Sequence, residues 1–323
     1  MKRRQFGAML ATATVSLGGL GSATAGASAE SAEPLELQDV SVELGSVTAS
    51  ISRAAFEYQE SAMELQLEGW SMEGDGRSLA IDETSVTVED VDEETYAAVR
   101  SALVETYTER SVSSLLTVIS DGTVPEGSPV EVSAGPIEKD GQTVADHVTA
   151  TGTAGEVVPE GTESLAEEGL SLGGVTGLGS STWSQLTVER GDSQLALEDV
   201  VMERDGTSLV VSASEGEAAL PDRTLDLSEV EMNTMPPETI PEEHVAFASE
   251  LRQLASEGSV SLSDVESAAA ESGVTVSNTA DAAENAQFVL SVGEASEGGE
   301  TLVSDFQTSG TLAELMQVLQ TRL

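Results

Sequence analysis

The chain has no cysteine among its 323 residues, which excludes disulfides, thiolate metal sites and lipid-modified cysteine anchors. Aromatic residues make up only 3% of it, too few for the stacked aromatic platforms of a typical glycan site. Its asparagines, Asn233, Asn278 and Asn285, do not begin Asn-x-Ser/Thr acceptors. Beyond the N-terminal segment, no apolar run approaches the roughly twenty residues that a membrane-spanning helix needs. We therefore expect no disulfide framework, envelope glycoprotein or membrane helix.

Basic residues are also scarce. The chain carries 13 Lys and Arg against 58 Asp and Glu, a formal net charge of −45. Setting aside residues 1–29 leaves ten basic residues against the same 58 acids, a net charge of −48. Binding to phosphates requires a basic face, so nucleic acid is excluded as a partner.

Lysine is the rarer of the two basic residues, because Lys139 is the only one after residue 29 and the other nine are arginines. This acidic, lysine-poor composition resembles that of secreted proteins of extremely halophilic archaea. The resemblance implies folding in strong salt, where screening shortens to about 3 Å, and diffuse association of cations with the surface. High charge and few aromatics are also typical of disordered chains, but here the apolar residues follow regular patterns.

The N-terminus indicates export. Arg3, Arg4 and Phe6 resemble a twin-arginine signal, and the mildly apolar residues 7–25 that follow suit that pathway. Cleavage is expected after residue 25 or residue 29. The sequence therefore predicts an exported protein, extracellular or associated with the cell surface, with a signal peptide at residues 1–29.

The clearest architectural signal is an internal repeat. Residues 63–81 align without gaps on residues 193–211, and nine of the nineteen positions are identical. Both segments contain an Asp-Gly pair, Asp75-Gly76 and Asp205-Gly206, between alternating apolar residues, the strongest short signal for a hairpin. The apolar phase slips by one between Leu67 and Met72 and again at the equivalent place in the second segment. This slip predicts a β-bulge near residues 68–69 and 198–199.

Amphipathic helices are expected after the strands of each copy. Tyr96, Val99 and Leu103 fall on one stripe behind the acids at 92–94, and a second pattern begins at residues 239–242. The predicted fold class is thus α+β: two similar modules of antiparallel strands, each a hairpin with a bulge, followed by amphipathic helix.

These patterns divide the chain as follows. The repeat modules are expected at residues 35–122 and 170–273. Residues 123–169, rich in Gly, Thr and Glu, are expected to be a linker or irregular segment, although Val130, Val132, Val144 and Val157 offer short strands there. Residues 274–323 form a tail that ends in an amphipathic helix.

No organised catalytic, cofactor or metal site emerges from the sequence. His147 and His244 each follow an acid, but no Gly-x-Ser-x-Gly elbow is present to supply a nucleophile. Trp70 has Val200 as its repeat counterpart, which favours a core position over a sugar platform. The Glu73-x-Asp75-Gly76 run lacks the regular spacing of a calcium loop, and the glycine-rich 173–179 lacks the lysine of a phosphate cradle.

The leading functional hypothesis is a non-catalytic, structural or partner-binding protein that acts at the cell surface or in the medium. Its partner would be an unknown protein or cell-surface component. The alternative is a carrier of an apolar ligand or lipid, because long amphipathic strands backed by helices can form a half-open curved sheet. An extracellular hydrolase is the weakest of the three hypotheses.

Overall fold

The computed structural model contains one large antiparallel sheet. The residues it describes are 34–44, 47–74, 76–109, 123–157, 181–205, 208–235, 262–273 and 287–310, with single helical positions between 243 and 253. The signal segment at residues 1–29, His244, the glycine-rich 173–179 and the C-terminal helix expected after residue 310 lie outside these ranges.

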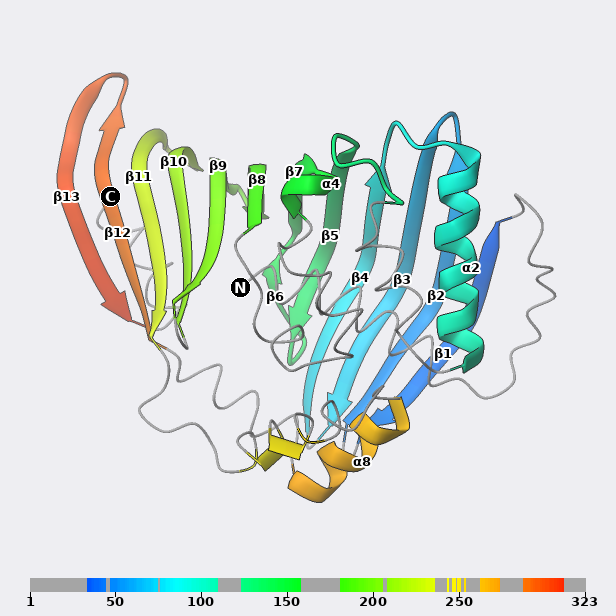
Figure 1. Cartoon of the computed structure of the whole chain (residues 1–323). Helices are drawn as coiled ribbons and strands as arrows, with labels where there is room; N and C mark the ends of the chain where they lie inside the picture. The colour runs from blue at the N-terminus through cyan, green and yellow to red at the C-terminus, as the bar shows by residue number, and fades with distance from the viewer. Residues whose placement is uncertain are drawn as a thin grey trace.

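The elements follow one another along the chain with hairpin turns between most neighbours (Figure 1). The first part comprises β1 (Leu35–Leu44), β2 (Val47–Gln59), β3 (Ala62–Gly74), β4 (Arg77–Val88), α2 (Glu93–Glu109), β5 (Pro129–Lys139), β6 (Gln142–Ala145), β7 (His147–Thr153) and α4 (Ala154–Val157). The second comprises β8 (Ser181–Arg190), β9 (Ser193–Asp205), β10 (Ser208–Leu220), β11 (Arg223–Met235), α8 (Leu262–Ser272), β12 (Gln287–Glu297) and β13 (Glu300–Gly310).

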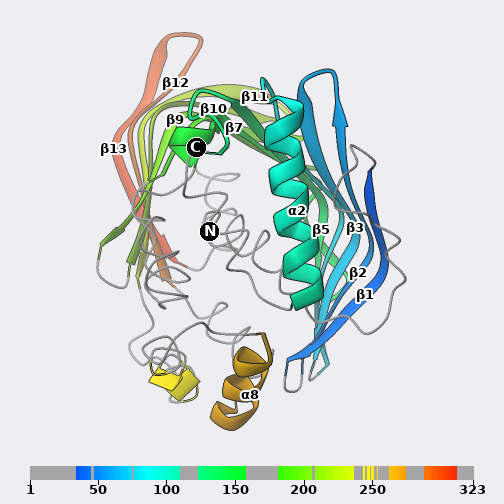
Figure 2. The same ribbon diagram turned by 45° about the vertical axis from the view of Figure 1, so that its right-hand side comes forward.

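The sheet follows chain order, β1-β2-β3-β4-β5-β7-β8-β9-β10-β11-β12-β13, with β6 paired to β5. Because β5 and β7 connect β4 to β8 by lateral pairing, strands from the two repeat modules belong to a single sheet. The sheet bends into a deep curve, and α2 lies on its concave side (Figure 2). Its ends, β1 and β13, each pair with one neighbour among the described strands.

The two faces of this sheet differ in polarity, because side chains alternate along each strand. One row of register partners crosses all twelve strands on the concave face: Leu35, Phe56, Leu65, Val86, Val132, Ala150, Leu186, Leu197, Gly216, Leu227, Ala295 and Val303. The neighbouring row lies on the outer face: Glu36, Ala55, Gln66, Ser85, Ser133, Thr149, Thr187, Ala196, Glu217, Asp226, Ser296 and Thr301.

The long strands change face once, along a line that we call the crease. Ladder pairing skips one or two positions on each strand there, and the skipped positions include Asp39, Ser52, Gly69, Asp82 and Pro136 in the first half, and Ser184, Asp199, Ser214, Glu229, Gly293 and Asp305 in the second. On alternate strands the crease residue has a left-handed backbone, with φ of 60° at Gly69 and 50° at Asp199. Leu67 and Trp70, three residues apart, are therefore both buried.

The predicted phase change is confirmed at both repeats, but its mechanism differs from the expected bulge. The register between β3 and β4 is the same on both sides of Gly69, so no extra residue is inserted. The same holds at Asp199 between β9 and β10. At the crease, two successive residues of each strand instead lie on the outer face, and the paired residues of the neighbouring strands do the same. Kinks of this kind are a known way to curve a sheet.

The expected α+β fold class is wrong, because the described residues form a mainly antiparallel β structure with few helices. The segment expected as a linker contributes β5, β6 and β7, and the expected tail contributes β12 and β13. Val130, Val132 and Val144, which offered short strands, do lie in β5 and β6, whereas Val157 belongs to α4. The full extent of these strands was not predictable because they present small residues such as Ala134, Ala150 and Gly152. Their apolar positions are also interrupted at the crease, which breaks each long alternation into short pieces.

The predicted helix after β4 is confirmed as α2, and its expected stripe is buried at Tyr96, Val99 and Leu103. Its first turn is capped by Asp92, whose carboxylate accepts a hydrogen bond from the backbone N–H of Thr95 at 2.8 Å. That bond lowers the pKa of Asp92. A further short helix, α8, ends just before Gly273. None of the helices in the described ranges has the length and apolar composition needed to cross a bilayer.

Candidate functional site: the concave face of the sheet

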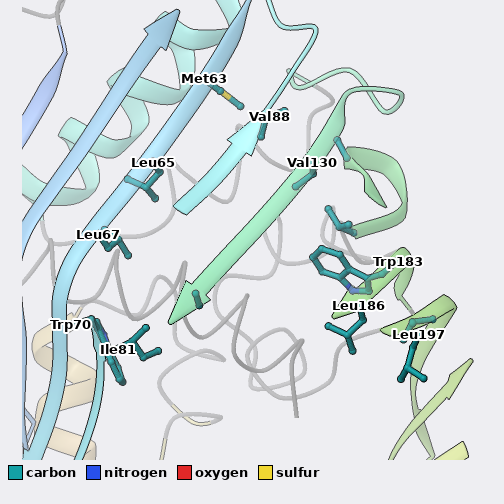
Figure 3. Close-up of a cluster of buried hydrophobic side chains, with 14 of the residues drawn as sticks. Met63, Leu65, Leu67, Trp70, Ile81, Val88, Val130, Trp183, Leu186 and Leu197 are labelled. Atoms are coloured by element: carbon teal, nitrogen blue, oxygen red, sulfur yellow. The ribbon is translucent and has the colours of Figure 1, made fainter. Parts of the chain in front are cut away.

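The candidate site is the apolar concave face, and its side chains form one continuous cluster. The cluster extends from Leu35 and Leu37 on β1 to Val292 and Ala295 on β12. Aliphatic side chains and alanine dominate it, with few rings. Figure 3 shows part of this cluster, with Met63, Leu65 and Leu67 along β3 and Leu186 and Leu197 on β8 and β9. A surface of this kind complements flexible hydrocarbon better than it complements polar solutes.

Helices cover the two ends of the first half of this face. α2 packs over β2, where the ring of Tyr96 stacks on Phe56 and Tyr58 at centroid distances of 4.9 and 5.3 Å. α4 lies against β5, β7 and β8, where its Ala154 and Val157 are buried. For the strands β9–β13, no helix in the described ranges makes comparable contact. The helices of the described part therefore cover less of the sheet than its apolar face occupies.

Polar groups enter this apolar region at α2. The hydroxyl of Tyr96 donates a hydrogen bond to the backbone carbonyl of Phe56 at 3.3 Å. Burial raises the pKa of Tyr96, because the phenolate would lose its hydration, and the nearby Arg100 opposes that effect. Arg100 is itself only 3% exposed. One of the chain's few cations is thus held inside the molecule rather than on its acidic surface.

Both tryptophans lie on the concave face, one in each half of the sheet (Figure 3). Trp70 on β3 is the register partner of Ile81, and Trp183 on β8 is the register partner of Val200. Trp70 and its repeat counterpart Val200 are both buried, which confirms the expected core position. The indole N–H of Trp70 is inaccessible to solvent and has no hydrogen-bond partner. Sequence reasoning identified the core position but could not show this unpaired donor.

The outer face carries polar pairs that hold strands together. Arg53 on β2 bridges both neighbouring strands, at 2.9 Å to Glu36 and 2.6 Å to Glu68. Its hydrogen bond lowers the pKa of Glu36. Arg77 lies 3.0 Å from Asp140 beside the β3–β4 hairpin, where Gly76 has a φ of 78° as a turn requires. The hairpin expected there is confirmed by the pairing of Gly74 with Arg77.

The second expected hairpin is also present, with a one-residue difference in its turn. Its innermost pair is Asp205 with Ser208, so Asp205 belongs to the strand rather than to the turn. The helix pattern expected from residues 239–242 follows a further strand, β11, and its first residues lie outside the described ranges. Each half contains four strands, then a helical segment, then two main strands. By this order β3 corresponds to β10, whereas the sequence repeat aligns β3 with β9.

The described histidine, His147, lies away from the apolar face. Its Nε2 is 3.2 Å from the hydroxyl of Ser133 on the adjacent strand, and Glu189 is its register partner on the other side. These residues belong to the outer face of the central strands, where the backbone groups around them are occupied by the sheet ladder. This arrangement ties β5 to β7.

Metal-binding clusters do not occur in the described ranges, since three or more His, Asp or Glu side chains nowhere come together at ligand spacing. Comparisons of the chain with protein-family models, with curated proteins and with solved structures found no match.

Proposed function

We propose that this chain is an exported, non-catalytic binding protein that carries an apolar ligand, such as the acyl chains of a lipid, on the concave face of its sheet. One observation carries the proposal: the unbroken apolar row from Leu35 to Val303 on the inner side of a curved, open-ended sheet. The polar row beside it remains on the outer face. Export follows from the expected signal at Arg3, Arg4 and Phe6.

A curved apolar surface favours an elongated ligand over a compact protein partner. Burial of hydrocarbon contributes about 25 cal/mol per Å² of apolar surface, and each further strand adds contact along an acyl chain. A structural scaffold would need only a filled core, and it would have no reason to extend the apolar row evenly from edge to edge. The concavity therefore favours the carrier over the partner-binding scaffold.

The primary experiment is mass spectrometry of solvent extracts from mature protein purified in strong salt. We expect lipid in near-stoichiometric amount, and recovery of binding when stripped protein is incubated with the same lipid. Protein that is folded, ligand-free and unable to take up lipid after stripping would contradict the carrier and support the scaffold.

A pair of substitutions on β7 localises the binding. Ala150 belongs to the apolar row and Thr149, its chain neighbour, belongs to the outer row. Ala150→Phe fills space on the concave face, and we expect it to lower the bound lipid about two- to tenfold, in line with a loss of roughly 0.5–1.4 kcal/mol of apolar contact. Thr149→Phe adds the same ring to the other face and should leave lipid content unchanged. Circular dichroism of both variants checks that the sheet is intact, and equal losses in both would refute the concave face as the site.

A further inference from the structure

The apolar concave face contains an indole donor, Nε1 of Trp70, that has no hydrogen-bond partner within the fold. Trp70 is only 8% exposed, and its indole nitrogen has no acceptor within hydrogen-bonding reach. The residue follows the crease on β3, and its ring lies beside Ile81 among the aliphatic side chains of the concave face (Figure 3). An indole nitrogen is a donor only. Only a hydrogen-bond acceptor can therefore satisfy this group.

The fold itself has no use for this donor. A buried donor without an acceptor destabilises the folded state, because it has lost its hydrogen bonds to water. The repeat counterpart, Val200, is fully buried on the same face and fills its place with hydrocarbon alone. A leucine or phenylalanine at position 70 would bury a comparable apolar surface without leaving an N–H group unpaired. The donor is thus an addition to a surface that is otherwise made for packing.

We infer that the apolar ligand carries an oxygen acceptor within its hydrocarbon body, an ester or amide carbonyl, which accepts a hydrogen bond from Nε1 of Trp70. This inference rests on the proposed carrier function and narrows its ligand class from any hydrocarbon to acylated lipids. A carbonyl loses its hydrogen bonds to water when it enters an apolar site. The indole N–H restores one of them, and both groups are then satisfied.

The test compares two probes of similar length and shape, methyl palmitate and octadecane, in equilibrium binding to the mature protein in strong salt. Wild-type protein should bind the ester more tightly than the alkane. Trp70→Phe keeps an aromatic ring and removes the donor, so it should weaken ester binding about fivefold relative to alkane binding, the size of one net hydrogen bond. The ester-to-alkane ratio cancels any general loss that comes from the smaller ring.

Ile81→Leu is the matched control, because it changes the apolar side chain paired with Trp70 without removing a donor, and it should leave the ratio unchanged. A second measurement needs no variant. In nitrogen-15-labelled wild-type protein, the indole proton of Trp70 should move downfield with methyl palmitate and not with octadecane.

The outcomes separate the two proposals. If both probes bind but Trp70→Phe leaves the ratio unchanged and the Trp70 indole proton responds equally to both, the carbonyl inference is wrong and the carrier function stands. If neither probe binds the folded wild-type protein, the carrier function fails and the inference fails with it.

Discussion

Single residues at the crease decide on which face each strand carries its apolar side chains. Left-handed backbone is unfavourable for residues with a Cβ, costing roughly 1–2 kcal/mol. Asp39, Asp199, Glu229 and Asp305 nevertheless adopt it, with φ between 50° and 53°. Aspartate tolerates this conformation better than most residues, and the surrounding ladder holds it in place. The strain is spread over strands in both halves of the sheet.

Gly69 is the crease position where a side chain is least acceptable. Its φ is 60°, and a Cβ there would lie 2.4 Å from the hydroxyl oxygen and 3.0 Å from the Cβ of Ser52. Gly69→Ala should therefore lower the free energy of unfolding by about 2–3 kcal/mol, through left-handed strain and steric overlap together. Urea unfolding in strong salt measures the change.

Gly76 provides the control for this substitution. It also has a left-handed backbone, with φ of 78°, but a Cβ there would meet no atom within 4 Å. Gly76→Ala should cost only the conformational part, about 1 kcal/mol. Equal effects of the two substitutions would show that the contact with Ser52 carries no energy.

The residue scale was partly accessible from sequence. The spacing of Leu67 and Met72 revealed a change of face, and Leu197 and Met202 repeated it. A bulge was the natural interpretation because one strand was considered at a time. Only the pairing shows that Ser52 and Asp82 break at the same level as Gly69. A crease shared by neighbouring strands is a property of the sheet, and no single strand encodes it.

At the scale of elements, α2 is fastened to the sheet by rings and by one buried hydrogen bond. Tyr96 is fully buried and donates to the carbonyl of Phe56. Tyr96→Phe preserves the stacking and should lower the free energy of unfolding by about 1 kcal/mol at neutral pH, the usual net value of such a bond. Tyr58→Phe removes a hydrogen bond of similar length but in a part-buried position, from the Tyr58 hydroxyl to the carbonyl of Val91 at 3.2 Å. Comparison of the two variants shows how much of the loss in Tyr96→Phe depends on burial of the bond.

The same tyrosine makes stability depend on alkaline pH. Burial raises the pKa of Tyr96 above its ordinary value of 10.0, so the folded state favours the protonated phenol. This contribution is fully present below pH 10 and is lost as the pH rises through the folded-state pKa. Urea unfolding above pH 10 should show a smaller decline for Tyr96→Phe than for wild-type protein. Parallel declines would mean that Tyr96 does not titrate with unfolding.

Elements with strong local signals were predictable, and those without them were not. The stripe of Tyr96, Val99 and Leu103 has the helical period, and an Asp-Gly turn separates β3 from β4. By contrast, β7 reads His-Val-Thr-Ala-Thr-Gly-Thr, with alanine and glycine on its apolar face. Its neighbours β5 and β8 complete the apolar surface around it, so the strand is defined by pairing rather than by its own hydrophobicity.

On the scale of the whole molecule, the outer face is dense with negative charge. Carboxylates even stand directly opposite one another on paired strands, as with Glu57 and Glu64, Glu68 and Glu83, and Glu198 and Glu215. Opposed side chains have Cβ atoms about 4.5–5.5 Å apart. That separation is well inside the Debye length of about 10 Å at 0.1 M salt but exceeds the 3 Å reached at 1 M. Repulsion across the ladder should therefore oppose folding in dilute buffer and fade in brine.

Salt titration of the mature protein, followed by circular dichroism, tests this account. We expect unfolding in dilute buffer and cooperative recovery as sodium chloride rises, with magnesium chloride effective at lower concentration because divalent ions screen more strongly. Glu198→Gln with Glu215→Gln removes one opposed pair and should lower the sodium chloride midpoint. Glu131→Gln with Glu231→Gln removes the same charge from exposed positions flanked by Thr or Ser partners, and should lower the midpoint less. Equal shifts would assign the salt requirement to net charge alone, whereas cooperative folding of wild-type protein in dilute buffer would show that carboxylate repulsion does not govern its stability.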